Sequence, residues 1–281
     1  MKRVPPCALQ GTGRLRPSLV LGFTLTEMLV SMAIFLVICG SAFTLLGISQ
    51  QRYQAESQKL NSFQEARLGL DQIMRDVSSA GYPPPNQFTV TPPNSDPQVA
   101  ASPFAWSPGY LSNTPCYIGG AGNPPCVTPW DDGFFIETNP TPEVNASPVD
   151  YIRYKMLNNN TLGRGVFPKN GGDPYATIPD SLLTPFVHNV MNEAAPGVIA
   201  QINAVYPNMF PGGIAVPVFT YLCDTPNKGP QVCTSPGTYG VPSNIRSVLV
   251  TLIVEAPPDP QTGQVRVIEL TGEASRINSF P

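Results

Sequence analysis

Hydrophobic and polar positions divide the chain into three parts. Residues 28–49 carry no charge and are mostly apolar. As an α-helix they would extend about 33 Å, close to the ~30 Å hydrocarbon core of a bilayer. Residues 50–80 are polar, but apolar side chains recur every three or four positions, which is typical of an amphipathic helix. After residue 82, short apolar segments alternate with loops rich in Pro, Gly and Asn, which predicts strands.

The placement of proline predicts where the long helix ends. No proline occurs from Ser18 to Tyr82, whereas 31 of the 34 prolines lie between Pro83 and Pro281. A proline inside a helix removes a hydrogen bond and clashes with the preceding turn, at a cost of about 3 kcal/mol. The sequence therefore predicts one continuous helix over residues 23–81, with a transmembrane part at 28–49, and no long helix afterwards.

The second half of this helix is expected to bury one face against a domain. Its charged side chains, Asp76 among them, are expected mostly on the exposed surface. The positions predicted to face the domain are Leu60, Phe63, Ala66, Leu70, Ile73, Met74, Val77 and Ala80.

Residues 82–281 are predicted to form a β-rich head. A hairpin with an Asn-rich turn is expected over residues 150–164, and a second one links 245–255 to 264–275. Residues 82–130 hold twelve prolines and read as a loop-rich insertion, and residues 179–195 as a short helix or irregular turn. The predicted strands are Gly133–Thr138, Val149–Leu157, Thr161–Phe167, Val198–Val205, Val216–Cys223, Ile245–Glu255 and Gln264–Ser275.

The residues before the apolar segment are basic. The first 22 residues contain four Lys or Arg side chains and no acidic one. Basic residues beside an apolar span stay on the cytoplasmic side, so we expect a cytoplasmic N-terminus and an exported head. A cleavable secretory signal is a competing interpretation, but its apolar region spans only about 7–15 residues. A plain signal anchor is the other competitor, and it leaves Glu27 unexplained.

Glu27 is the only charged side chain between Arg16 and Arg52. A carboxylate beside hydrocarbon is costly and normally has a partner. Residues 22–27 read Gly-Phe-Thr-Leu-Thr-Glu, with a basic leader before them and an apolar helix after them. This combination resembles the processing site of type IV prepilins and type II secretion pseudopilins. The residue at position 26 departs mildly from that pattern, because Ile or Leu is common there.

The resemblance implies a role for three residues. A membrane-embedded prepilin peptidase would cleave after Gly22 and N-methylate Phe23. In that family, the glutamate at the position of Glu27 pairs with the N-terminal ammonium of a neighbouring subunit in the filament. Each charge then offsets the burial penalty of the other. Loss of the leader would leave 12 basic against 19 acidic residues, a net charge of about −7, which suits a solvated head.

Residues 63–82 indicate which kind of prepilin the chain resembles. Their pattern, Ala-Arg at 66–67, Leu70, Arg-Asp at 75–76 and Ala-Gly-Tyr at 80–82, is similar to a stretch of PilW-type minor pilins. The predicted hairpin 150–164 is similar to a unit of these pilins and of pseudopilin J. The resemblance implies an α+β, pilin-like fold, in which the long helix packs on an antiparallel sheet. An ordinary amphipathic helix with a Gly stop is the competing interpretation of this stretch.

Six cysteines are present, and four of them lie in the predicted head. Cys7 belongs to the leader, and Cys39 lies in the apolar helix, where a thiol acts as a small apolar group. Nine residues separate the cysteines of each head pair, which predicts two local disulfides in an exported domain. Crossed pairing and a four-cysteine zinc site are the alternatives, although zinc pairs normally lie two to four residues apart. The two predicted pairs are Cys116–Cys126 and Cys223–Cys233.

Catalytic chemistry is not indicated. The chain has one histidine, His188, and none of the common nucleophile, zinc-protease or phosphate-loop motifs. Asp131 and Asp132 could bind calcium, but they lack the EF-hand spacing. No long basic run suggests nucleic-acid binding. We therefore predict a protein that is not an enzyme, with no catalytic residue, metal or cofactor.

The resulting hypothesis is a minor pilin of the PilW type that primes assembly of a type IV pilus and is incorporated near its tip. Its predicted domains are the leader 1–22, the helix 23–81 and the head 82–281. It would cross the inner membrane once, with a periplasmic head, and later reach the pilus surface. The implied partners are prepilin peptidase, other minor and major pilins, the inner-membrane assembly platform and the inner membrane.

Three alternatives stay open. A type II secretion pseudopilin of the J kind shares the leader, helix and sheet. A tip adhesin or DNA-uptake module would use the 82–130 insertion as its binding surface. The aromatic residues that make this conceivable are Phe88, Phe104, Trp106, Tyr110 and Tyr117. The third alternative is a membrane-anchored periplasmic enzyme.

Overall fold

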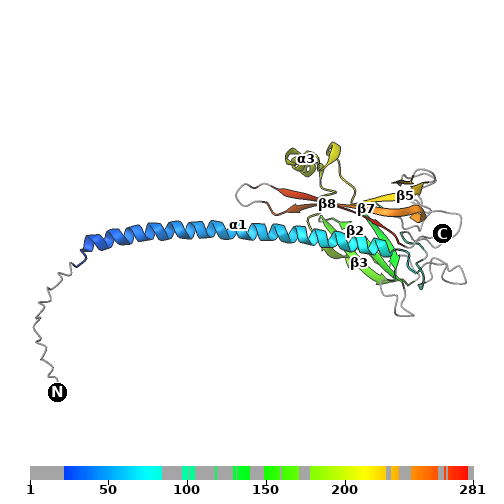
Figure 1. Cartoon of the computed structure of the whole chain (residues 1–281), viewed down its shortest axis with the longest axis horizontal. Coiled ribbons are helices and arrows are strands. Elements are labelled where there is room, and N and C mark those ends of the chain that lie inside the picture. The colour runs from blue at the N-terminus through cyan, green and yellow to red at the C-terminus, as the bar shows by residue number, and fades with distance from the viewer. Residues whose placement is uncertain are drawn as a thin grey trace, which may run out of the picture. The chain divides into compact units, whose positions relative to one another are not determined.

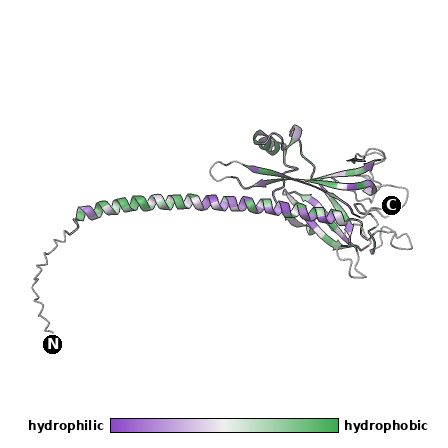
Figure 2. Cartoon of the chain, in the orientation of Figure 1, coloured by the Kyte–Doolittle hydropathy of each residue, from purple (hydrophilic) through white to green (hydrophobic). Residues whose placement is uncertain are grey.

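The computed structural model of the chain describes most of the long helix and the head. The described residues are 22–83, 97–100, 102–104, 118, 129–130, 132–139, 149–158, 160–170, 178–225, 229–233, 242–258, 263 and 265–277. The chain forms two units that divide between Gln51 and Arg52. The first unit contains the apolar half of helix α1 (Leu25–Ser79), and the second contains its polar half and the β-rich head (Figures 1 and 2).

The described part of the head contains two antiparallel four-stranded sheets (Figure 1). The first has the order β1-β2-β3-β4, and the second β6-β5-β7-β8. This confirms the α+β class and both predicted hairpins. The strand bounds are β1 Gly133–Thr138, β2 Asp150–Leu157, β3 Thr161–Pro168, β4 Thr184–Val187, β5 Phe219–Thr225, β6 Gly229–Val232, β7 Ile245–Ala256 and β8 Arg266–Ser275. Short 3₁₀ turns lie at Asp180–Leu182 (η2), Pro211–Gly213 (η3) and Pro242–Asn244 (η4).

The main hydrophobic core lies where α1 meets the inner faces of both sheets. Within it, the Phe134 ring contacts Phe219 edge-on, with 4.6 Å between ring centroids, which joins β1 to β5 across the two sheets. A Cβ at Gly272 of β8 would lie 2.7 Å from the sulfur of Met74, so a larger residue there would force the Met74 side chain to move. The helix residues in this core are Ala66, Leu70, Ile73, Val77 and Ala80, with Met74 partly buried beside them.

Two features of α1 differ from the prediction. Leu60 was expected to be buried, but 56% of it is exposed, because the helix meets the sheets mainly after this position. Asp76 was expected at the surface and is buried, with 7% exposure. The hydrophobic period alone missed it because a polar side chain interrupts the buried face where the head supplies partners.

Asp76 holds the end of α1 to the first sheet through a network of hydrogen bonds. Its Oδ2 accepts bonds from the Tyr154 hydroxyl at 2.5 Å and from Nη2 of Arg164 at 2.8 Å. Its Oδ1 accepts one from Gln72 at 2.8 Å. A buried carboxylate is tolerated when it is paired and hydrogen-bonded in this way. Burial, together with the negative charge of Asp76, raises the pKa of Tyr154 well above its ordinary value.

Segment 178–183 covers the outer face of the first sheet. Ile178 and Leu183 pack there against Phe135 and Tyr151. The Arg153 side chain, almost fully buried, donates to the Ile178 carbonyl and to Asp180, which fixes this cover. The predicted turn over residues 179–195 therefore contains η2 and the edge strand β4.

Helix α3 (Pro196–Val205) replaces the strand that was predicted at 198–205. The two β-branched residues at 198–199 favoured a strand. Pro196 at the first helical position and the spacing of the buried residues Ile199 and Ile202 fit a helix instead. The helix packs on Ile253 and Val267, on the face of the second sheet opposite α1 (Figure 1).

Hydrogen bonds made by Asn192 hold together the two ends of the segment that carries α3. Its side-chain Nδ2 donates to the carbonyls of Val216 and Thr251, and its Oδ1 accepts from the Ile253 amide. Its own carbonyl accepts from the Val216 amide. With the bridge between Val190 and Val254, these bonds let residues 189–192 continue the second sheet where β5 stops.

A buried ion pair anchors the described part of the Pro-rich insertion. Lys169 Nζ lies 2.8 Å from Glu137 Oε2 and 2.9 Å from the Val99 carbonyl, and both side chains are fully buried. Phe104 is also buried and packs near Phe134, so it is not available as a surface aromatic. The other four aromatic residues of the adhesin hypothesis lie outside the described residues.

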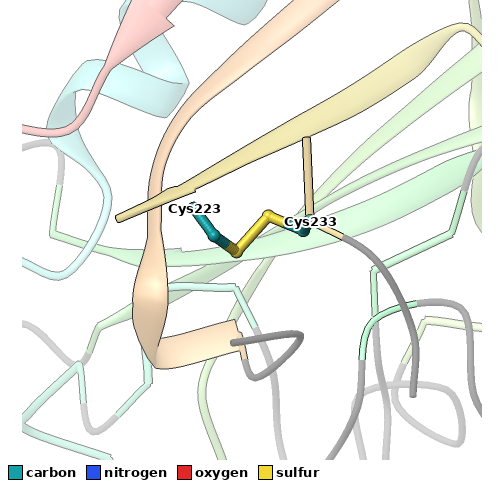
Figure 3. The surroundings of a disulfide bond; sticks show 2 residues. All are labelled: Cys223 and Cys233. Carbon is teal, nitrogen blue, oxygen red and sulfur yellow. A yellow bond between two sulfur atoms is a disulfide. The ribbon is translucent and has the colours of Figure 1, made fainter. Parts of the chain in front are cut away.

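Cys223 of β5 and Cys233 after β6 form the predicted disulfide (Figure 3). The two cysteines lie 10 positions apart in sequence, and the bridge between them joins the ends of the edge hairpin β5–β6. The other predicted pair, Cys116–Cys126, lies outside the described residues. Cys39 in α1 is free.

We predict that the head loses stability as pH rises above about 10. The unfolded chain releases the Tyr154 proton near the ordinary tyrosine pKa of about 10, while the folded head retains it. Above this pH the unfolded state binds fewer protons, so the free energy of unfolding falls, by at most about 1.4 kcal/mol per pH unit for one group.

Urea unfolding of the full chain in detergent, from about pH 9 to about pH 11, measures this decline. The slope should be shallower for Tyr154→Phe than for the wild type. Tyr53→Phe, at an exposed position of α1, is the matched control. Equal slopes for the wild type and Tyr154→Phe would contradict the prediction.

Candidate functional site

The first turn of α1 carries a capping box made by Thr24 and Glu27. The Thr24 hydroxyl accepts from the Glu27 amide at 3.3 Å, and the Glu27 carboxylate accepts from the Thr24 amide at 2.9 Å. The Thr24 hydroxyl also donates to Glu27 Oε2 at 2.8 Å. Because the first N–H groups of a helix have no partner within it, this reciprocal pair stabilises the helix start.

The capping box leaves part of the Glu27 carboxylate available. Both bonds from Thr24 go to Oε2, and no described residue bonds Oε1. The side chain is exposed at the N-terminal end of α1, where the helix dipole favours a negative charge. Glu27 can therefore hold its helix cap and receive a cation at the same time.

Gly22 and Phe23 lie immediately before this cap and are not in the helix. Phe23 is 81% exposed, and Gly22 is exposed as well. Sequence reasoning selected Gly22, Phe23 and Glu27, and the structure places the first two just before α1 and Glu27 in its first turn. It missed Thr24, although the Thr-x-x-Glu spacing of a capping box is visible in the sequence.

The apolar half of α1 follows this turn and is not covered by protein. An 18-residue window of the helix has a mean hydropathy of 2.4, and none of it is buried. Large apolar side chains such as Leu29, Phe35 and Leu45 are each more than 60% exposed. Hydrophobic residues dominate this half, whereas hydrophobic and hydrophilic residues are mixed along the second half (Figure 2). By length and composition the helix can cross a membrane.

His188 is not part of a catalytic group among the described residues. Its backbone amide and Nδ1 both contact Glu65 Oε1 at 2.7 Å, which ties the end of β4 to α1. Asp132 lies at the start of β1. The described residues contain no cluster of three or more His, Cys, Asp or Glu side chains that could hold a metal ion.

Comparison with known proteins gives one match. Residues 19–43 match a family model described as the prokaryotic N-terminal methylation motif. No curated protein matches the chain. No solved structure matches it either. The matched residues contain the capping box and most of the apolar segment 28–49.

The motif supports a protein of the type IV pilin or pseudopilin kind. It implies processing by prepilin peptidase and assembly with other pilins, and it suggests a structural subunit rather than an enzyme. The apolar helix is consistent with membrane anchoring before assembly.

Replacing Thr24 with Val should loosen the first turn of α1. Valine keeps the shape but removes the hydroxyl, and loss of an N-cap costs about 1 kcal/mol. Amide exchange at residues 25–28 of the full chain in micelles should rise about fivefold. Ser31→Ala, which removes a hydroxyl bonded to the Met28 carbonyl, is the control. Unchanged exchange in Thr24→Val would show that the cap contributes nothing.

Proposed function

We propose that this chain is a minor pilin of the PilW type, which is cleaved after Gly22, methylated at Phe23 and incorporated near the tip of a type IV pilus. The observation that carries the proposal is the arrangement at the start of α1. A capped, exposed Glu27 lies between the exposed pair Gly22–Phe23 and an apolar helix that no protein covers.

The mechanism is packing rather than catalysis. Before assembly, the apolar half of α1 resides in the inner membrane, and the head is periplasmic. During assembly this half leaves lipid and packs against the helices of neighbouring subunits. Oε1 of Glu27 receives the N-terminal ammonium of a neighbour, so that neither charge is buried unpaired. The ion pair also fixes the axial register between the subunits.

Support for the PilW type comes from the end of α1. Asp76, Ala80 and Gly81 of the PilW-like pattern lie at the contact between helix and head. Asp76 joins Arg164 and Tyr154, and the Gly81 amide donates to the Glu137 carbonyl of β1. The buried residues of the pattern therefore lie in the contact between α1 and the head, while Arg67 and Arg75 are exposed. A pseudopilin of the J kind would use the same helix and sheets, and neighbouring pilus or secretion genes would separate the two.

The first test is the N-terminus of the mature protein. Mass spectrometry of the chain purified from its host should find N-methylphenylalanine from Phe23 as the first residue. Replacing Gly22 with a bulky side chain should leave the leader attached. A mature chain that still begins with Met1 would refute the proposal.

The second test separates the charge of Glu27 from its capping role. Glu27→Gln keeps an acceptor for the Thr24 amide but removes the charge. Peptidase cleavage should continue, while incorporation into pili should fall about tenfold or more, since an ion pair worth about 1.4 kcal/mol changes an equilibrium tenfold. Asp71→Asn, at an exposed position in the polar half of α1, is the control. Wild-type incorporation of Glu27→Gln would refute the assembly role.

A further inference from the structure

Strand β8 forms one edge of the second sheet, and its outer side is unpaired among the described residues. Its ten residues pair with β7, so that Ser275 lies opposite Ser247 at one end and Arg266 opposite Ala256 at the other. They pair with no other described strand. A strand of this length with one open side is a template for another extended chain. Natural edges of this kind are usually short, bulged, interrupted by proline or protected by charged side chains, and of these features β8 has only the charged side chains.

Two backbone bonds show which groups of β8 point outward. The Arg276 amide donates to the Arg246 carbonyl, so even-numbered residues bond to β7. The Ile277 amide points the other way and donates to the Ser78 carbonyl of α1. Since hydrogen-bonded pairs alternate in an antiparallel ladder, the N–H and C=O groups of residues 267, 269, 271, 273 and 275 face away from β7.

The two faces of β8 have different chemistry. On the face toward α1, Ile268, Leu270 and Gly272 are partly covered by the helix. On the opposite face, Glu269, Thr271 and Glu273 are exposed, and Oε1 of Glu273 accepts a hydrogen bond from the Ser247 hydroxyl at 2.7 Å, which leaves Oε2 without a bond to any described residue. An added strand would therefore place apolar side chains beside α1 and would meet two carboxylates on the other face.

We propose that the β8 edge binds an extended segment of another protein, which adds a strand to the second sheet and carries two basic side chains four residues apart. The outward backbone groups of residues 267–275 supply the ladder, and Glu269 and Glu273 select the basic residues. Opposite charges directly across a strand pair are stabilising, whereas like charges are destabilising.

A second copy of this chain is a poorer occupant. Antiparallel pairing of two β8 strands along their whole length centres on Thr271. That register places Glu269 of each copy opposite Glu273 of the other, so two carboxylate pairs would repel. Charge complementarity therefore favours a different, basic partner.

The test uses the full chain in micelles and the synthetic peptide acetyl-TVKVTVKVT-amide, whose lysines are four residues apart. The control peptide acetyl-TVEVTVEVT-amide has glutamate at both positions. Fluorescence anisotropy should show binding of the lysine peptide at least tenfold tighter than that of the glutamate peptide. Amide exchange at residues 267, 269, 271, 273 and 275 should be fast in the free protein and slow with the lysine peptide.

Two variants make the test specific. In the backbone, Thr271→Pro removes an N–H that points away from β7, and an edge strand tolerates this change. It should weaken the binding of the lysine peptide at least tenfold. Glu269→Lys changes an exposed side chain and should reverse the preference between the two peptides.

Slow exchange of the outward amides in the free protein would overturn the proposal, because the edge would already be covered. Equal binding of the two peptides, or unchanged binding to Thr271→Pro, would also overturn it. Self-association that Thr271→Pro abolishes would identify a second copy as the occupant instead. None of these outcomes depends on leader cleavage, so the pilin proposal is tested separately.

Discussion

The contact between the last turns of α1 and the two sheets is the interaction on which the head depends. The helix supplies residues from Ala66 to Ala80 to a core that both sheets share. Neither sheet could bury its inner face in this way without the helix, because their facing residues converge on it. Glycines 69 and 272 let the chains approach closely, since a Cβ at either position would overlap a neighbouring side chain.

Polar groups inside this contact make it specific. A purely apolar interface would allow the helix to slide by one turn, whereas Asp76 finds Arg164 and Tyr154 in one register only. Farther along the helix, Glu65 meets His188 and Glu56 meets Arg266. These outer polar contacts are partly exposed and contribute little stability individually, but they align the helix with β4 and β8.

The sequence was sufficient for the parts of the fold that follow simple periods. The long helix, both hairpins, six strand positions and the Cys223–Cys233 bridge were predictable from proline placement, alternation and cysteine spacing. Helix α3 was not, because β-branched residues at its start outweighed the signal of Pro196. Asp76 was missed because its partners lie 78 and 88 residues away in sequence. At the candidate site, Glu27 was conspicuous as a lone charge, but its bond to Thr24 became clear only in the structure.

The closure at Asn192 has a consequence for how this head can vary. Residues 192 and 216 are bonded to each other through backbone and side chain, and Asn192 is also bonded to Thr251 and Ile253 of β7. The stretch between these two residues begins and ends at one fixed point beside β7. Its length therefore does not affect the pairing of the strands in the second sheet. A change of length between these residues can therefore be absorbed without shifting the register of β7, provided that α3 still covers Ile253 and Val267.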